Sequence, residues 1–354
     1  MKAGIFDPYL DTIGGGERYC LTIAELLLAK NWQVDLFWPD EKIRIRLMEK
    51  FALDLERVNF VPYTPRVNNL INRYKFERRY DFLFYFSDGS IPLMFGKKNI
   101  LHFQVPFQNV LTKSLKNSFK LKTIDFIVCN SFFTKKIIDS CLGTNSLVVY
   151  PPVDTVAFKP LEKENIILSV GRFSQLLQGK KQDVLVDAFK ELTKQKNLDK
   201  WKLVLAGGTE VGAGNFVKNL RNAAKGFSIE IIENPPFSEL LRLYGKAKIF
   251  WTASGFGIDE EKQPERVEHF GITTVEAMAA GCVPLVLGAG GQKEIVSEGV
   301  SGFWWEKTGE LKALTLKVIE EPTLMKKISR NAILRSKAFS KEEFYRNISQ
   351  LVEE

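Results

Sequence analysis

The chain has 354 residues, of which 45% are hydrophobic and 26% charged, a composition typical of a globular protein with about two domains. Its four cysteines are far apart and form no CxxC pair, which argues against a disulfide framework or a zinc site. The longest apolar run, residues 82–95, is interrupted by Asp88 and is shorter than the ~18 residues of a membrane span, and no signal-peptide segment opens the chain, so we expect a cytoplasmic protein.

Strand-like and helix-like segments alternate along the first half of the chain. Helical spacing of apolar residues predicts a helix over residues 17–29, and short apolar runs predict strands over 2–6, 34–38, 98–103 and 126–129. The pair Pro151-Pro152 then interrupts the pattern, because adjacent prolines cannot continue a helix and favour an extended segment.

The same alternation restarts after this linker. We expect strands over 166–170, 202–205, 228–232, 248–252 and 283–287, and helices over 182–194, 215–224, 238–244 and 274–280. Such alternation predicts parallel sheets with helices on both faces. The predicted fold is therefore α/β, with two doubly wound, Rossmann-like domains (residues 1–155 and 156–338) and a last helix (339–354) that packs back toward the first domain.

Three glycines, Gly14, Gly15 and Gly16, separate the first strand from the first helix, and Glu17 follows them. Glycines at a helix start let backbone N–H groups approach an anion closely, which suits a phosphate or a sugar. A tight turn without a ligand would also use glycine, and Glu17 would then simply complement the helix dipole. The GxGxxG spacing of a dinucleotide site is absent, which disfavours a nicotinamide oxidoreductase.

Basic residues follow the first strand of the second half. Gly171-Arg172 comes directly after that strand, and Lys180 and Lys181 open the next helix. Doubly wound sheets bind ligands beyond the carboxyl ends of their strands, so Arg172 and Lys180 are expected to neutralise a diphosphate. Charge grows on a departing nucleoside diphosphate, and these cations would stabilise that transition state.

Two carboxylates stand eight residues apart in the segment that carries the most information. Glu268 precedes a predicted helix and Glu276 lies in its early turns, so both are expected to face one cleft. Between them, the N–H groups of residues 271–274 are expected to be free to bind phosphate or sugar hydroxyls, with Thr273 or Thr274 as the N-cap. Paired carboxylates also suit a glycosidase, but here they adjoin the predicted phosphate site.

Together these segments resemble family 4 of the glycosyltransferases, the retaining group with the GT-B fold, in which two Rossmann-like domains face each other across a cleft. The resemblance covers nearly the whole chain. It rests on the glycine loop at 14–17, the segments at 169–172 and 180–185, the two glutamates within 268–281, and Gly290-Gly291-Gln292. The stretch 173–179 is longer than in many members, so Lys180 is assigned less directly than Arg172.

The resemblance implies a role for each matching position. It implies that Arg172 and Lys180 hold the donor diphosphate, that Glu276 binds the ribose, and that Glu268 contacts the transferred sugar. His102 matches a histidine position on the acceptor side and completes the candidate catalytic set, although a core histidine is the alternative for it. The donor-binding set further includes Gly15, Gly16, Glu17, Phe270, Gly271, Ile272 and Thr273, with Asn234 and Pro236 near the base.

The sequence also bears on metal use. It contains no Asp-x-Asp motif, and the cluster Asp259-Glu260-Glu261 is expected to be a solvated loop. Metal-dependent transferases need such carboxylates for their cation, so we expect neither a metal nor another cofactor, with Arg172, Lys180 and a helix dipole in its place. The resemblance implies retention of configuration, with the leaving phosphate taking the acceptor's proton.

The net charge of +8 lies largely in the first half, where residues 66–79 and 113–122 mix basic and aromatic residues. Solvated helix faces would explain them, and attraction to an anionic membrane or a lipid-linked phosphate acceptor is the functional alternative. No nucleic-acid motif accompanies the charge.

The predicted activity is transfer of a hexose, mannose or glucose, from a UDP- or GDP-sugar to a glycan or lipid-linked acceptor, at the cytoplasmic face of a membrane if the basic segments touch one. A phosphorylase or synthase of the same architecture is one alternative. A catalytically silent nucleotide-binding partner of another transferase is the other.

Overall fold

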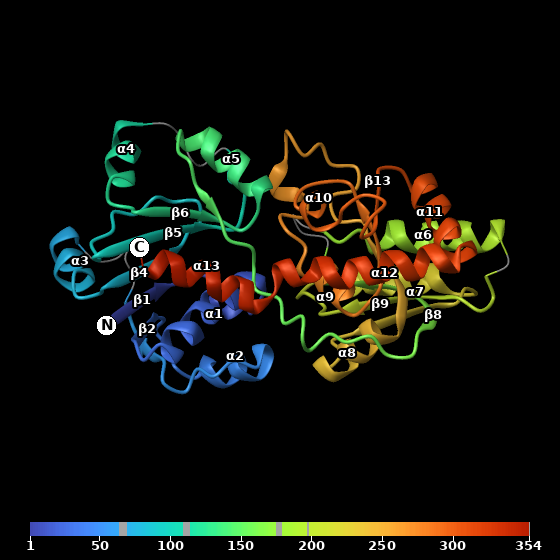
Figure 1. The fold of residues 1–354 in the computed structure, drawn as a ribbon, viewed down its shortest axis with the longest axis horizontal. Helices are drawn as coiled ribbons and strands as arrows, with labels where there is room; N and C mark the ends of the chain where they lie inside the picture. The colour runs from blue at the N-terminus through green and yellow to red at the C-terminus, as the bar shows by residue number, and fades with distance from the viewer. Residues whose placement is uncertain (64–68, 109–113, 175–178, 197, 354) are drawn as a thin grey trace. The chain divides into compact units, whose positions relative to one another are not determined.

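A computed structural model describes residues 1–63, 69–108, 114–174, 179–196 and 198–353 of the protein. The chain forms two compact units, one of Met1–Pro152 with Glu342–Glu354 and one of Val153–Lys341. Each unit is built on one parallel sheet with helices packed against it (Figure 1). The predicted α/β class with two Rossmann-like sheets is confirmed.

The sheet of the first unit has seven strands in the order β3-β2-β1-β4-β5-β6-β7, and all of its pairings are parallel. The strands are β1 (Lys2–Phe6), β2 (Gln33–Phe37), β3 (Asn59–Val61), β4 (Phe82–Phe86), β5 (Lys98–Phe103), β6 (Phe126–Cys129) and β7 (Leu147–Val148). The strand order reverses between β1 and β4, and a doubly wound sheet binds its ligand beyond the carboxyl ends at such a switch point.

The central strand β4 was not expected from the sequence. All five of its residues are buried, because parallel strands with helices on both faces have no polar side. Such a strand shows a continuous apolar run without alternation. The apolar run at 82–95 therefore did not indicate that its first five residues form a strand.

The last helix, α13 (Lys341–Glu353), completes the core of the first unit. Phe344 is 2% exposed and its ring lies 4.7 Å from that of Tyr19 on α1 (Gly15–Ala29), while Ile348 and Leu351 join the same core. The remaining helices of this unit are α2 (Ile43–Phe51), α3 (Leu70–Glu77), α4 (Leu115–Leu121) and α5 (Phe132–Leu142).

The sheet of the second unit has six parallel strands in the order β10-β9-β8-β11-β12-β13, with its switch point between β8 and β11. These strands are β8 (Glu164–Val170), β9 (Lys202–Gly207), β10 (Ile229–Glu233), β11 (Ala247–Thr252), β12 (Val283–Leu287) and β13 (Phe303–Trp305). The helices are α6 (Gln182–Gln195), α7 (Gly214–Ala224), α8 (Phe237–Lys246), α9 (Ile272–Ala279), α10 (Gln292–Ile295), α11 (Thr308–Glu320) and α12 (Pro322–Ser336). Among the described residues, none of the helices is both long enough and apolar enough to cross a membrane.

The substitution Phe344→Ala tests the contribution of α13 to the first unit. Removing this buried ring is expected to lower the free energy of unfolding by about 3–5 kcal/mol, measured by chemical denaturation. The control is Ile45→Ala, an exposed side chain of the same unit, which should cost less than about 1 kcal/mol. Equal effects of the two substitutions would show that α13 is not part of this core.

Candidate active site

The carboxyl ends of β8 and β11 carry an ion pair between residues far apart in the chain. The Nζ atom of Lys180 lies 2.7 Å from Oε2 of Glu268, and the two side chains are 23% and 15% exposed. Lys180 precedes α6, and Glu268 lies in the loop between β11 and α9. The structure thus brings together, at the switch point of the sheet, two residues that the sequence assigned to one site.

Local backbone contacts hold Lys180 in this position. A Cβ atom on Gly171 would lie only 2.8 Å from Cγ of Lys180, so the lysine stem packs where a side chain would otherwise be. The carboxamide of Gln182, a residue 2% exposed, donates a 3.0 Å hydrogen bond to the carbonyl of Arg172. Gln182 was not expected to contribute, and it fixes the turn that carries the two basic residues.

The charge on Glu268 is stabilised within the site. Burial raises the pKa of this carboxyl, but the charge and hydrogen bond of the Lys180 ammonium, together with His269 and Ser254, more than offset that effect. The pKa of Glu268 therefore lies below its usual range, and the carboxylate is ionised at neutral pH.

Two glycines pack against the backbone carbonyl of Glu268. A Cβ atom on Gly290 would lie 2.1 Å from the Glu268 carbonyl oxygen, and the N–H of Gly291 donates to the same oxygen over 2.8 Å. Glu260 accepts a hydrogen bond of 2.6 Å from the N–H of Gly290 and pairs with Lys293 at 3.0 Å. The expectation that the cluster Asp259-Glu260-Glu261 is only a solvated loop is therefore wrong, since Glu260 fixes this glycine turn.

Helix α9 begins earlier than expected. Its N-cap is Gly271, at φ 119°, so neither Thr273 nor Thr274 is the cap. The N–H of Thr274 donates to the Gly271 carbonyl over 3.0 Å and is not free. Within the described residues the N–H groups of Ile272 and Thr273 have no acceptor, as expected for a first turn, and they remain available to an anionic or hydroxyl ligand.

Glu276 lies on α9 and is 7% exposed. Its Oε2 atom accepts a 2.9 Å hydrogen bond from the hydroxyl of Tyr244, a fully buried residue of α8 that the sequence did not single out. Tyr244 therefore orients the carboxylate. The side chain of Phe270 belongs to the core, 3% exposed and with its ring 5.5 Å from that of Phe339, so only its backbone is placed to meet a ligand.

The other candidate donor residues of this unit lie at the same edge of the sheet. Arg172 lies two residues after the end of β8; its side chain is exposed and has no acidic partner within the described residues. Asn234 follows β10 in the left-handed region, at φ 51°, where its side-chain oxygen accepts a 3.1 Å hydrogen bond from the N–H of Thr209. Pro236 is the N-cap of α8.

The glycine loop of the first unit follows β1 and opens α1. The carboxylate of Glu17, 4% exposed, accepts a hydrogen bond from the N–H of Gly14 and closes the helix start. A Cβ atom on Gly16 would lie 2.9 Å from the ring of Phe86, so this glycine, next to Gly15, lets the first turn of α1 pack against the end of β4. The structural alternative for Glu17 was that it complements the helix dipole, and its hydrogen bond to the Gly14 N–H adds a capping contact at the same helix start.

His102 lies in the interior of the first unit. The residue is fully buried, and its ring is stacked 4.0 Å from that of Tyr19. Burial lowers the pKa of His102 to about 3, against the opposing effects of Gln104 and the Val128 backbone, so the ring is neutral. Because no part of it is exposed, His102 is not included in the function proposed below.

A buried carboxyl, Asp7, stands at the carboxyl end of β1 next to the glycine loop. It is 1% exposed, and one of its oxygens accepts a 2.9 Å hydrogen bond from the N–H of Tyr9. Burial, with a smaller contribution from the nearby carboxylate of Glu17, raises the pKa of Asp7 to about 7, against the opposing hydrogen bonds of the Tyr9 backbone and the Cys20 thiol. This shift could not be predicted from the sequence, because it arises from packing in the folded unit.

The raised pKa of Asp7 predicts how stability depends on pH. Between the ordinary value of 3.8 and about 7, the folded protein binds a proton at Asp7 that the unfolded chain has lost, so this group lowers stability as pH rises through that range. Asp7→Asn removes this dependence. The variant is expected to gain stability relative to the wild type between pH 4 and 7.5, by up to about 4 kcal/mol, measured by thermal unfolding across that range.

The control for this measurement is Glu49→Gln, an exposed side chain on α2 of the same unit that is not among the groups acting on Asp7. A stability difference between Asp7→Asn and the wild type that does not change with pH would contradict the assignment.

Comparison with known sequences gives relatives that are themselves transferases. An uncharacterized glycosyltransferase of Methanocaldococcus jannaschii is 28% identical over 253 residues, covering 69% of this chain and 65% of its own length. The GDP-Man:Man(3)GlcNAc(2)-PP-Dol alpha-1,2-mannosyltransferases of Xenopus laevis and Homo sapiens are 31% and 30% identical, covering 63% and 62% of this chain and 47% and 46% of their own. The chain therefore spans about half to two thirds of the length of these relatives.

Solved structures share the two-sheet architecture along the whole chain. HepE from Anabaena in complex with UDP and glucose matches with a TM-score of 0.75 at 18% identity, covering 100% of this chain and 99% of its own. Sucrose-phosphate synthase from Thermosynechococcus elongatus matches with a TM-score of 0.71 at 15% identity, covering 100% and 98%. These similarities concern the fold, which is that of the GT-B glycosyltransferases.

The sequence model of a family described as glycosyl transferases group 1 matches residues 154–335, which is more than half of the chain and contains the Lys180–Glu268 pair. The chain belongs to the glycosyl transferases group 1 family.

Proposed function

We propose that the protein is a retaining glycosyltransferase that moves a hexose from a UDP- or GDP-sugar to a glycan or lipid-linked acceptor without a metal ion. The observation that carries this proposal is the Lys180–Glu268 ion pair at the β8/β11 switch point. The exposed Arg172 lies close by in sequence, two residues after the end of β8. Cations and a carboxylate at one such edge suit a donor that has both a diphosphate and a sugar.

The cations account for the leaving group. The Lys180 ammonium has three N–H donors, and Glu268 occupies one position beside it, so others remain for phosphate oxygens. The Arg172 guanidinium has no acidic partner among the described residues and can bind two oxygens at once. Charge that develops on the leaving diphosphate would therefore meet groups that are already in place.

The carboxylates account for the rest of the donor. Glu268, ionised and held by Lys180, accepts a hydrogen bond from a sugar hydroxyl, and Glu276, oriented by Tyr244, accepts hydrogen bonds from the ribose. The free first-turn N–H groups of α9 lie between them and suit the phosphates. Asn234 and Pro236, at the end of β10, border the base.

The acceptor is assigned to the first unit, whose sheet has its switch point between β1 and β4. The named relatives use GDP-mannose and an acceptor linked to PP-Dol, which supports mannose and a lipid-linked acceptor, whereas the HepE structures with UDP and glucose keep UDP-glucose as the other donor. A lipid-linked acceptor would place the reaction at the cytoplasmic face of a membrane.

Retention follows if the acceptor attacks from the face that the diphosphate leaves. The leaving phosphate then takes the proton of the acceptor hydroxyl, and no separate base is required. Glu268 is engaged by Lys180, which favours its hydrogen-bonding role over a nucleophilic one.

Nucleotide binding tests the roles of Lys180 and Glu276. A thermal-shift titration with UDP, GDP and ADP should raise the melting temperature with one of them. Lys180→Met and Glu276→Ala are each expected to weaken that nucleotide about 10- to 100-fold, because each removes a hydrogen bond to or from a charged group.

The matched control is Lys196→Met, which removes an exposed ion pair with Glu320 at the other end of α6 and should bind the nucleotide as the wild type does. If no nucleotide shifts the melting temperature, the assigned roles of Lys180 and Glu276 are refuted. If a nucleotide binds but no donor sugar is hydrolysed, the silent-partner alternative replaces this proposal.

Metal use and stereochemistry form a separate test. The lack of an Asp-x-Asp motif, together with the cations at the β8/β11 edge, predicts that turnover continues in a chelator. NMR of the glycosylated product should show the same anomeric configuration as the donor sugar. Loss of turnover in EDTA that magnesium or manganese restores would refute metal independence, and inversion would refute the retaining mechanism.

A further inference from the structure

Two short helices of the first unit carry apolar side chains that point into solvent. Leu115 and Phe119, on one face of α4, are 93% and 63% exposed. On α3, Ile71 is 68% exposed and is flanked by the exposed side chains of Leu70 and Tyr74. We call these residues, with the basic residues of the same helices, the α3–α4 surface.

The charge on this surface has one sign. The exposed cations on and directly after the two helices are Lys75, Arg78, Arg79, Lys116 and Lys122. The only carboxylate in either helix is Glu77, which is 3% exposed and engaged with Arg73 and Tyr63. The surface therefore presents apolar tips among positive charges, and no exposed negative charge of these helices opposes them.

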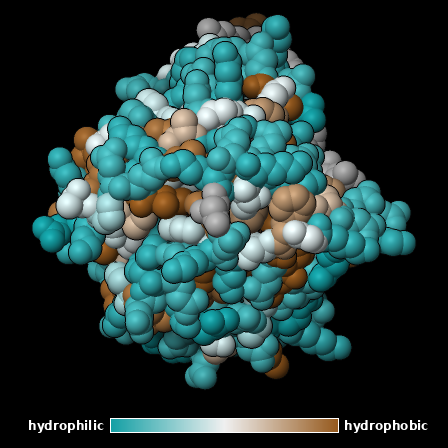
Figure 2. Space-filling model, turned by 90° about the vertical axis from the view of Figure 1, so that its right-hand side faces the viewer, coloured by the Kyte–Doolittle hydropathy of each residue, from teal (hydrophilic) through white to brown (hydrophobic). Residues whose placement is uncertain are grey.

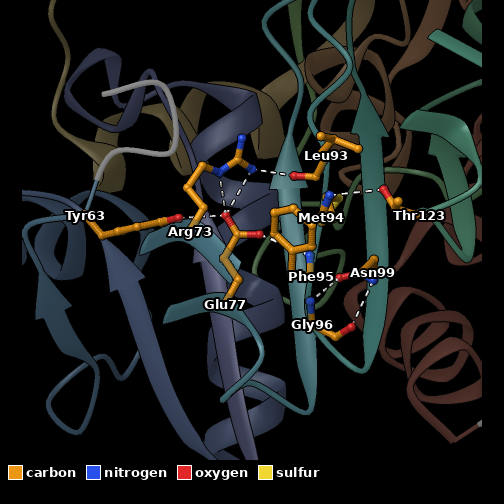
Figure 3. Close-up of polar contacts among 9 residues, drawn as sticks. All are labelled: Tyr63, Arg73, Glu77, Leu93, Met94, Phe95, Gly96, Asn99 and Thr123. Carbon is orange, nitrogen blue, oxygen red and sulfur yellow. Dashed lines mark hydrogen bonds and ion pairs between the residues drawn. The ribbon is translucent and has the colours of Figure 1, made fainter. Parts of the chain in front are cut away.

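Both helices are fastened to one segment of the chain, residues 91–96, as Figure 3 shows in part. Arg73 donates to the carbonyl of Leu93, and Glu77 accepts from the N–H of Phe95 over 3.1 Å. Next to α4, Thr123 accepts from the N–H of Met94 over 3.1 Å, and Lys120 donates to the carbonyl of Ile91 over 2.7 Å.

On α3 the polar contacts to this segment use the buried Arg73 and Glu77. On the side of α4, which has no buried residue, they use the half-buried Lys120 and Thr123. These hydrogen bonds hold both helices against residues 91–96, so the exposed apolar and basic side chains belong to helices with a defined position.

Among the described residues of the second unit, exposed large apolar side chains are distributed over several loops and two helices. They are Val156, Leu161, Val211, Phe237, Val300 and Leu334. Figure 2, which views the molecule from the side of α6 and α11, shows mainly hydrophilic residues with small separate hydrophobic areas. Single exposed apolar residues are ordinary, whereas a group of them among like charges marks an interaction site.

We propose that the α3–α4 surface docks on an anionic lipid bilayer, with Leu115, Phe119 and Ile71 entering the headgroup region. Positive charge attracts the surface to anionic headgroups, and apolar side chains gain free energy by leaving water at the boundary of the acyl chains. Two of the basic residues noted from the sequence, Arg66 and Lys113, lie outside the described residues and are not part of the argument.

The inference rests on the proposed function only for its purpose, which is to bring the first unit to a lipid-linked acceptor. Its physical basis, the charge and exposure of α3 and α4, is independent of the donor site.

Sedimentation with lipid vesicles tests the proposal. The full chain should bind vesicles of equal parts phosphatidylglycerol and phosphatidylcholine, bind pure phosphatidylcholine weakly, and lose affinity as salt is raised. The variant Lys75→Glu/Lys116→Glu/Lys122→Glu should bind about 100-fold more weakly, since each basic residue contributes about a factor of five. Ile71→Ser/Leu115→Ser/Phe119→Ser should bind about 10-fold more weakly.

The controls carry the same changes on exposed residues of the second unit. They are Lys218→Glu/Lys225→Glu/Lys326→Glu and Val211→Ser/Val300→Ser/Leu334→Ser, and both should bind as the wild type does. If a triple variant melts early, the single variants Lys116→Glu and Leu115→Ser take its place, because both positions are exposed.

Three results would overturn the proposal: no binding of the wild type to anionic vesicles, equal binding to neutral ones, or loss in the controls as large as in the α3–α4 variants. The first result would leave an acidic protein as the partner of this surface. Hydrolysis of the donor sugar without vesicles separates the two proposals. Its rate should be equal in the wild type and the α3–α4 variants. If the wild type shows no hydrolysis, the proposed donor site is contradicted and the docking proposal is not affected.

Discussion

The candidate site depends on how closely backbone segments approach one another at the carboxyl ends of β8 and β11. Lys180 and Glu268 are 88 positions apart in the chain. They can meet because the backbone positions closest to them are glycines, which have no side chain to keep the segments apart. The stem of Lys180 packs over Gly171, the carbonyl of Gly171 would be only 2.1 Å from a Cβ atom on Gly207, and Glu268 rests on Gly290. The charge arrangement is thus a consequence of backbone packing in the sheet.

Two buried carboxyls show opposite electrostatics in the two units. Asp7 has another carboxylate beside it and no cation among the groups that shift its pKa, and it holds its proton to near neutral pH. Glu268 has an ammonium in contact and is held ionised. Burial acts in the same direction on both, so the sign of the nearest charge decides which of them is an anion in the folded protein.

Elements with a pattern of their own could be predicted from the sequence, and elements that depend on packing could not. The strands β1, β5, β6 and β12 were predicted with their bounds. The positions of Arg172, Lys180 and Glu268 after strands, and of Glu276 early in a predicted helix, led to the assignment of these four residues to one site, which stays a prediction. Strand β4 lacks alternation, and the start of α9 is set by the left-handed Gly271. Gln182 and Tyr244 act through hydrogen bonds across the fold, for which spacing gives no signal.

The placement of α13 has a consequence for biogenesis. The core of the first unit is completed by Phe344, Ile348, Leu351 and Val352, and all its other buried members precede residue 150. The second unit, Val153–Lys341, lies between these two parts of the sequence. During translation the second unit can fold as soon as it leaves the ribosome, whereas the first must wait, with part of its apolar surface open to water, until α13 emerges. The nascent first unit is therefore the part of this protein that chaperones would be called on to shield.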